Sequence, residues 1–187
     1  MFDRLLPTDI FRAHWKALSD YRGATTVPDY PTRAVLLGAP LLATALSFKF
    51  GFELRLPEGA LAALALLAGG FLTAFTHLSS VRLRLTEREP AWGDAERFDR
   101  DAIDETCAHL LVAAYMSGVA TGWLLLGMNF GAGAGTGDDM IVGFWAAIEA
   151  GLLVYVVVLF LITLPRLYQA YLTYAHVRDA LNGAHRD

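Results

Sequence analysis

The chain has 187 residues, of which 55% are hydrophobic and 18% are charged, and its formal net charge is −4. A soluble domain usually carries about 25% charged residues, so this composition argues against that class, and the net charge argues against general nucleic-acid affinity. Four apolar runs each reach the roughly 18–20 residues needed to cross a bilayer: about 34–52, 59–80, 107–128 and 141–164. The sequence predicts an all-α membrane protein with four transmembrane helices.

The segment before the first apolar run, residues 1–32, carries its own helical pattern. Thr8 is a good N-cap, and Gly23 is a candidate helix terminator. Apolar side chains recur between them at helical spacing: Ile10, Phe11, Trp15 and Leu18. We therefore expect an N-terminal amphipathic helix, which either lies in the lipid interface or packs against other cytoplasmic helices.

The remaining chain, 33–187, reads as one four-helix transmembrane bundle with helical extensions. The second helix is expected to continue past the bilayer to about Arg88, before Pro90. A charged helix then leads into the third span, giving a cytoplasmic hairpin over about 81–106. Beyond Pro165 the helical pattern persists, which predicts a cytoplasmic C-terminal helix over about 165–183.

The distribution of positive charge predicts the orientation. Thirteen of the 15 Lys and Arg residues fall in three segments that alternate with the spans: 1–33, 81–105 and the tail from 165. The two other loops contain the remaining two. Because Lys and Arg favour the cytoplasmic side, both termini are predicted to be cytoplasmic, with the protein in a bacterial inner membrane.

Small residues on the third helix suggest close helix packing. Gly118 and Gly122 have GxxxG spacing, and Gly69 lies on the second helix. Helices in lipid associate through such residues, because lipid itself is as apolar as leucine. We expect contacts between copies in a homo-oligomer, with packing inside one chain as the alternative.

The fourth apolar run contains one charged residue, Glu149. A helix starting near Ile141 would place it about 12 Å deep at 1.5 Å per residue. A ring of such carboxylates on an oligomer axis would favour cations in a pore. The alternative is a neutral Glu149 that hydrogen-bonds to Tyr115 or Thr121 and only fixes the packing.

Aromatic and basic residues gather at the predicted cytoplasmic ends of the second and fourth helices: Arg82, Arg84, Arg88, Arg166, Tyr168, Tyr171 and Arg178. They could line a pocket for a partner protein or an anionic ligand such as a nucleotide or single-stranded nucleic acid. An interfacial aromatic belt with cytoplasmic charges is the favoured interpretation.

Two histidines, His77 and His109, fall near the same predicted depth on antiparallel helices. Such a pair could ligate haem or a metal, whereas helix-end histidines commonly just face the interface. No nucleophile elbow or metalloprotease motif is present. We therefore predict neither an enzymatic activity nor a required cofactor.

Together these features favour an oligomeric, channel-like pore gated through its cytoplasmic helices by a ligand or partner. In size and topology the chain is similar to small four-span membrane effectors of bacterial anti-phage systems, which disrupt the membrane when triggered. Two alternatives remain: a non-conducting anchor that recruits a cytoplasmic enzyme, and a haem-binding redox protein.

Overall fold

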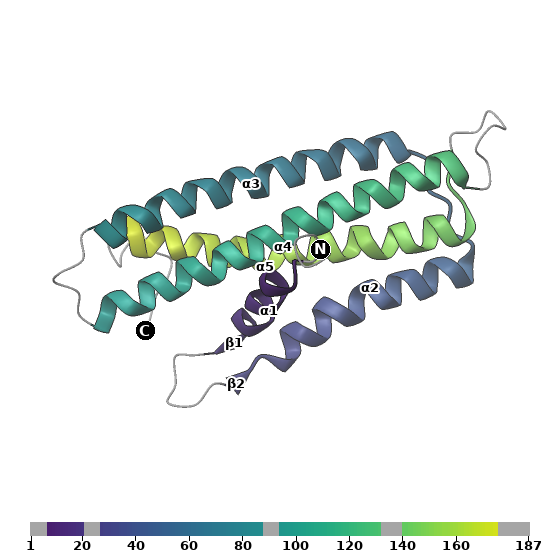
Figure 1. The fold of residues 1–187 in the computed structure, drawn as a ribbon. Helices are drawn as coiled ribbons and strands as arrows, with labels where there is room; N and C mark the ends of the chain where they lie inside the picture. Colours follow the sequence, from purple (N-terminus) through teal and green to yellow (C-terminus); the bar gives the residue numbers. More distant parts are fainter. Residues whose placement is uncertain (1–6, 21–26, 88–93, 132–139, 176–187) are drawn as a thin grey trace.

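The computed structural model describes residues 7–20, 27–87, 94–131 and 140–175. They form five helices and one pair of two-residue antiparallel strands (Figure 1). In chain order the elements are α1 (Thr8–Ala17), β1 (Ser19–Asp20), β2 (Val27–Pro28), α2 (Tyr30–Phe50), α3 (Pro57–Glu87), α4 (Asp94–Phe130) and α5 (Gly143–Ala175). The strand pair, which the sequence did not predict, connects α1 to α2.

Four of these helices are long and apolar enough to cross a membrane: Tyr30–Phe50, Pro57–Leu83, Ile103–Phe130 and Gly143–Tyr168. This confirms the expected number of spans. The structure also confirms that α3 and α5 continue well beyond their apolar runs, and that α5 passes Pro165 without ending. The expected helix end near residue 183 lies outside the described residues.

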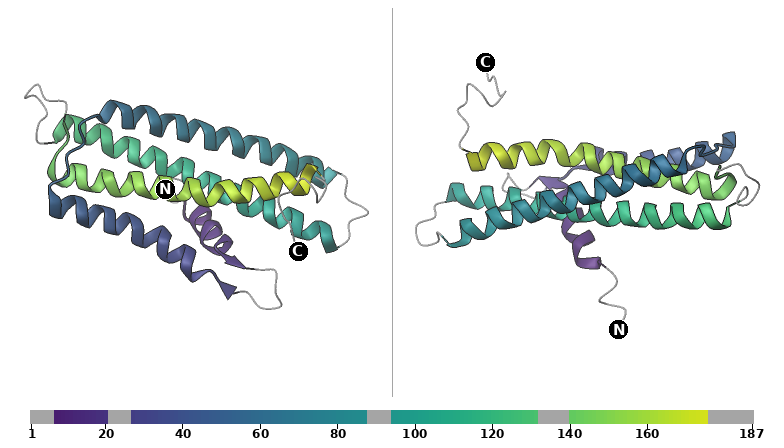
Figure 2. Two further views of the ribbon diagram at one scale, coloured as in Figure 1. Left: turned by 180° about the vertical axis from the view of Figure 1, so that it is seen from behind. Right: turned by 90° about the horizontal axis from the view of Figure 1, so that it is seen from above.

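The long helices are arranged in the order α3–α4–α5–α2, each contacting the next (Figures 1 and 2). Within the described residues α2 and α3, at the two ends of this order, do not contact each other. The short helix α1 lies against one face of this row and packs on α4 (Figure 2). The arrangement is an open row with α4 and α5 at its centre.

The distribution of buried apolar side chains reflects the positions of the helices in the row. Most buried apolar side chains belong to α4 and α5, whereas Leu36 is the buried residue of α2. Much of α2 instead exposes large apolar side chains, such as Leu41 and Phe48. Such surfaces are stable against lipid or another protein, and contiguous ones are rare on soluble monomers.

Local sequence explains where α2 begins and ends. Asp29 precedes it, and its carboxylate accepts hydrogen bonds from the Thr32 N–H at 3.2 Å and the Thr32 hydroxyl at 2.5 Å. At the other end Gly51 adopts a left-handed conformation with φ of 64°, which glycine tolerates best. The following turn pairs Leu54 with Ile141 through two backbone hydrogen bonds of 2.9 and 3.1 Å, fixing the turn to the start of α5.

Candidate functional site

The amphipathic face of α1 is packed against α4. Ile10 and Phe11 are half-buried and Leu18 is fully buried. The Phe11 ring meets Tyr115 of α4 edge to face, with ring centroids 5.7 Å apart. Helix packing is therefore the arrangement found for α1, although Trp15 lies 40% exposed on its outer side. The expected Thr8 cap is not formed: Thr8 is the first helical residue, and no side-chain cap bond is present at this end.

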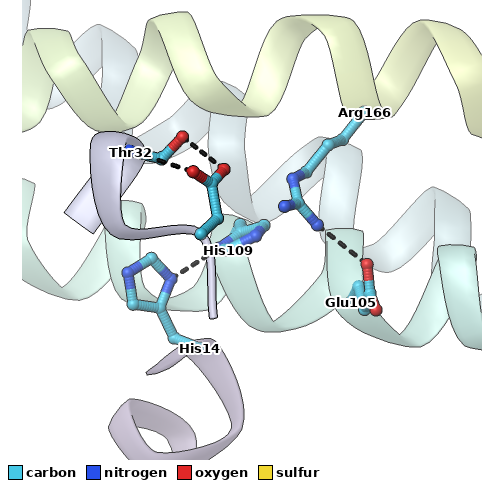
Figure 3. A network of polar contacts seen from close by, with 6 residues as sticks. His14, Thr32, Glu105, His109 and Arg166 are labelled. Atoms are coloured by element: carbon cyan, nitrogen blue, oxygen red, sulfur yellow. Dashed lines mark hydrogen bonds and ion pairs between the residues drawn. The ribbon is translucent and has the colours of Figure 1, made fainter. Parts of the chain in front are cut away.

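A buried pair of histidines joins α1 to α4 (Figure 3). The Nδ1 atoms of His14 and His109 lie 2.6 Å apart, and the two residues are 2% and 0% exposed. One ring must donate its Nδ1–H and the other must accept, so at least one ring is neutral. Both Nε2 atoms are buried without a hydrogen-bond partner among the described residues.

Burial favours the neutral form of the histidine from α1. Desolvation, with a smaller contribution from the positive charge of Arg166, lowers the pKa of His14 from 6.5 to about 4. At neutral pH the His14 ring is therefore uncharged. An uncharged ring suits a buried contact, because a charged ring there would repel Arg166.

Charged groups surround this pair on neighbouring elements. Arg166 of α5 donates to Glu105 of α4 at 2.8 Å, and Figure 3 shows both close to His109. Asp29 lies at the start of α2, where the hydrogen bonds from Thr32 hold the pKa of its carboxyl below the ordinary value. We call His14, Asp29, Glu105, His109 and Arg166 the polar cluster. It brings α1, α4, α5 and the start of α2 together.

The start of α2 also holds the end of α1 directly. The Arg33 guanidinium donates to the Trp15 carbonyl at 3.0 Å and to the Ser19 hydroxyl at 2.8 Å. It lies 4.7 Å from the centre of the Trp15 ring, in a cation–π arrangement. The Asp29 N–H donates to the Leu18 carbonyl at 3.1 Å. These contacts make α1, the strand pair and the start of α2 one connected unit.

Glu149 lies apart from the polar cluster, in the membrane-spanning part of α5. It is 1% exposed, and neither of its carboxyl oxygens has a hydrogen-bond partner among the described residues. Because α5 begins at Gly143, Glu149 is about 9 Å along the helix at 1.5 Å per residue, closer to that end than expected. α5 lies between α2 and α4, so Glu149 is enclosed within one chain.

Neither proposed partner of Glu149 is bonded to it. Tyr115 contacts Phe11 of α1, and Thr121 is half-buried on α4. Neither residue hydrogen-bonds to Glu149 in the described part of the chain. Glu149 is thus a buried carboxyl without the hydrogen bonds that the packing alternative required.

The histidine pair differs from the one expected. His77 is exposed on α3, and His109 meets His14 instead. The two rings are edge to face with centroids 4.5 Å apart, which leaves no room for a haem plane between them. Among the described residues no group of three or more potential metal ligands is present. The signal for His14 was its place on the apolar face of α1, between Phe11 and Leu18.

Two of the basic residues expected near a pocket, Arg82 and Arg166, form ion pairs with α4. Arg82 of α3 pairs with Asp104 at 3.0 Å, and Arg166 of α5 pairs with Glu105, so α4 supplies both carboxylates. Tyr168 and Tyr171 are exposed. The side chain of Arg84 and the whole of Arg88 and Arg178 lie outside the described structure. Arg82 and Arg166 thus connect α3 and α5 to α4.

The glycines differ in what they face. A side chain at Gly69, Gly118 or Gly122 would meet no atom of the described structure within 4 Å, so these positions face away from the chain's own helices. At Gly151 a side chain would collide with the Thr44 hydroxyl and approach the Pro40 carbonyl. Gly151 therefore allows α2 to lie close to α5. Its signal in the sequence is the small-residue spacing from Ala147 to Gly151, which was not among the predicted packing positions.

No protein-family model, curated protein or solved structure matches this chain.

Proposed function

We propose that this chain is a channel-like membrane protein that conducts protons or small cations past Glu149 and is gated through α1. The observation that carries the proposal is the buried Glu149 carboxyl, which has no partner in the described structure. A charged side chain deep in a bilayer costs roughly 2.5–3.5 kcal/mol on insertion scales, and ionisable residues at such positions are usually retained for function. An ion pathway would give this carboxyl a role that packing does not require.

The pathway that fits this geometry runs inside each chain. An axis shared between copies would reach Glu149 only if α2 or α4 moved away from α5, because α5 lies between them. The conformation described here is therefore assigned to the closed state. Opening would separate α2 from α5 and admit water to the carboxyl.

The contacts of α1 provide a way to control this separation. Arg33, together with the bond between Asp29 and Leu18, connects α1 to the start of α2. Displacement of α1 from α4 would therefore pull on α2. In this proposal the trigger is a cytoplasmic protein or a nucleotide-type ligand that binds at this end of a homo-oligomer in a bacterial inner membrane.

The experiment compares ion flux in liposomes for the wild-type protein and three variants. Arg33→Gln should weaken the hold on α1 and raise flux. Glu149→Gln in the Arg33→Gln background should remove the cation-selective part of that flux. Glu58→Gln in the same background is the control, because Glu58 is exposed at the start of α3.

Two results would overturn the proposal. Flux through Glu149→Gln that matches the control in size, selectivity and pH dependence would leave Glu149 as a packing residue. Absence of flux from both the wild type and Arg33→Gln, with correct folding, would instead favour a non-conducting membrane anchor.

A further inference from the structure

A cleft of about 550 Å³ opens between α1, α2 and α5, separate from Glu149. Its lining combines apolar and aromatic side chains with two basic ones: Phe11, Arg12, Trp15, Lys16, Leu37 and Tyr155. Arg12 and Lys16 are one helical turn apart on α1, so they lie on the same face of the helix. The cleft therefore has apolar walls and a positively charged edge.

The residues that line the cleft lie at different distances from the ends of the apolar helices. Leu37 is seven residues into α2, so it lies about 10 Å from the start of that helix. Tyr155 is 13 residues before the end of the α5 span at Tyr168, which places it about 20 Å from that end. Leu37 is 48% exposed and Trp15 is 40% exposed, so the cleft is open at the surface of the chain.

We propose that this cleft binds one anionic phospholipid, with its phosphate on Arg12 and Lys16 and one acyl chain between α1, α2 and α5. Both basic residues are exposed, and the contact of Arg12 with the exposed Asp9 is a long one of 3.8 Å. Exposed pairs of this kind are weak, so a phosphate can compete for the guanidinium. Trp15, between the two basic residues, suits headgroup depth.

A second observation points to a ligand at the same place. His14 lines the cleft, is 2% exposed, and has an Nε2 atom without a partner among the described residues. An ester oxygen or a glycerol hydroxyl of a bound lipid could satisfy this nitrogen, whichever tautomer His14 adopts. Buried polar atoms of this kind usually have partners, so the unpaired Nε2 supports an occupant.

The apolar lining of the cleft favours a lipid over a soluble anion as the ligand. A nucleotide or free phosphate would use Arg12 and Lys16 but would leave Phe11, Leu37 and Tyr155 uncovered. An acyl chain covers these side chains and enters directly from the bilayer. Because the bound lipid would contact both α1 and α2, it would stabilise the docked position of α1; this inference does not depend on ion conduction.

The test uses purified full-length protein in detergent, titrated with phosphatidylglycerol, phosphatidylcholine or inorganic phosphate. Native mass spectrometry counts bound molecules, and thermal unfolding reports stabilisation. We expect one phosphatidylglycerol per chain to bind more tightly than phosphatidylcholine. Arg12→Gln combined with Lys16→Gln should weaken this binding on the order of tenfold or more, because each basic residue near an anionic lipid contributes about 1 kcal/mol. Leu37→Trp should weaken the binding of both lipids by filling the cleft.

The matched control is Lys49→Gln combined with Arg55→Gln, which removes two positive charges at the opposite end of α2. Equal losses in the two double variants would show a net-charge effect and overturn the proposal. Equal binding of the two lipids, or inorganic phosphate that displaces phosphatidylglycerol, would overturn it as well. Unfolding of each variant without lipid verifies that the fold is intact.

Discussion

At the scale of single residues, the hydrogen bond between His14 and His109 joins α1 to α4. A fully apolar face would also bury α1, but it would tolerate sliding along α4. A hydrogen bond of 2.6 Å between two buried rings fixes one register, because displacement would leave further nitrogen atoms unpaired. The histidine pair thus makes the docking of α1 on α4 specific, although it requires that two polar rings be buried.

This contact predicts that the docking of α1 weakens in acid. The pKa of His14 is about 4 when α1 is docked and 6.5 in the unperturbed side chain, so the docked form binds fewer protons between these values. The contribution of the pair is complete above about pH 6.5 and is lost as the pH falls towards 4. Hydrogen-exchange protection factors of the α1 amides, corrected for intrinsic rates, should fall between pH 7.5 and pH 5.

Two variants make this measurement specific. His14→Gln should lower protection at pH 7.5 and remove most of its pH dependence, because glutamine does not titrate. His77→Gln, at an exposed histidine of α3, should behave like the wild type. Identical protection of wild-type α1 at both pH values would contradict the prediction.

At the scale of elements, α2 lies at one end of the row and contacts α5 alone among the long helices of the described structure. It contacts α5 and exposes most of its apolar surface. Gly151 matters here because the absence of a side chain lets the backbone of α2 approach α5 beside Thr44. A helix attached on one side through a small residue can move without disrupting the α3–α4–α5 core, as the proposed gate requires.

Gly151→Leu should therefore destabilise the protein, although leucine is the better helix former. The new side chain would collide with the Thr44 hydroxyl and push α2 away, and overpacking of this kind typically costs about 1–3 kcal/mol. Thermal unfolding in detergent measures the change. Gly38→Leu on α2 is the control, since a side chain there meets no described atom within 4 Å. Equal midpoints for the two variants would show that α2 and α5 do not depend on this contact.

At the scale of the whole molecule, the row leaves a small-residue face of α4 uncovered by the described structure. Gly118 and Gly122 of α4 point away from the helices of their own chain, so intrachain packing does not explain their spacing in the described structure. Either lipid or a second copy covers them. The GxxxG spacing allows close approach of two backbones, which favours the second copy.

Gly118→Leu and Gly122→Leu should consequently lower the oligomeric mass in nanodiscs while leaving the monomer fold unchanged. Mass photometry or light scattering gives the mass, and helical content by circular dichroism verifies the fold. Gly38→Leu again supplies the control at an open glycine on a different helix. Wild-type mass in both α4 variants would show that this face contacts lipid.

Several features could be predicted from the sequence alone: the four spans, the continuation of α3 and α5 past the apolar runs, and the unusual position of Glu149. These features depend on local properties: the length of an apolar run, helical spacing, and the cost of a carboxyl in hydrocarbon. They are readable without knowing which helix neighbours which. The amphipathic character of α1 was evident for the same reason.

The side-chain contacts and the order of the helices, in contrast, are seen only in the folded chain. His14 and His109 are 95 residues apart, and their spacing in the sequence carries no trace of their contact. The order α3–α4–α5–α2 encloses Glu149, opens Gly118 and Gly122 outwards, and makes Gly151 the site of close approach. Helices in lipid lack a strong hydrophobic force that selects neighbours, so small differences in side-chain fit and polar pairing choose among many possible orders. That choice is a property of the assembled chain, and no single segment specifies it.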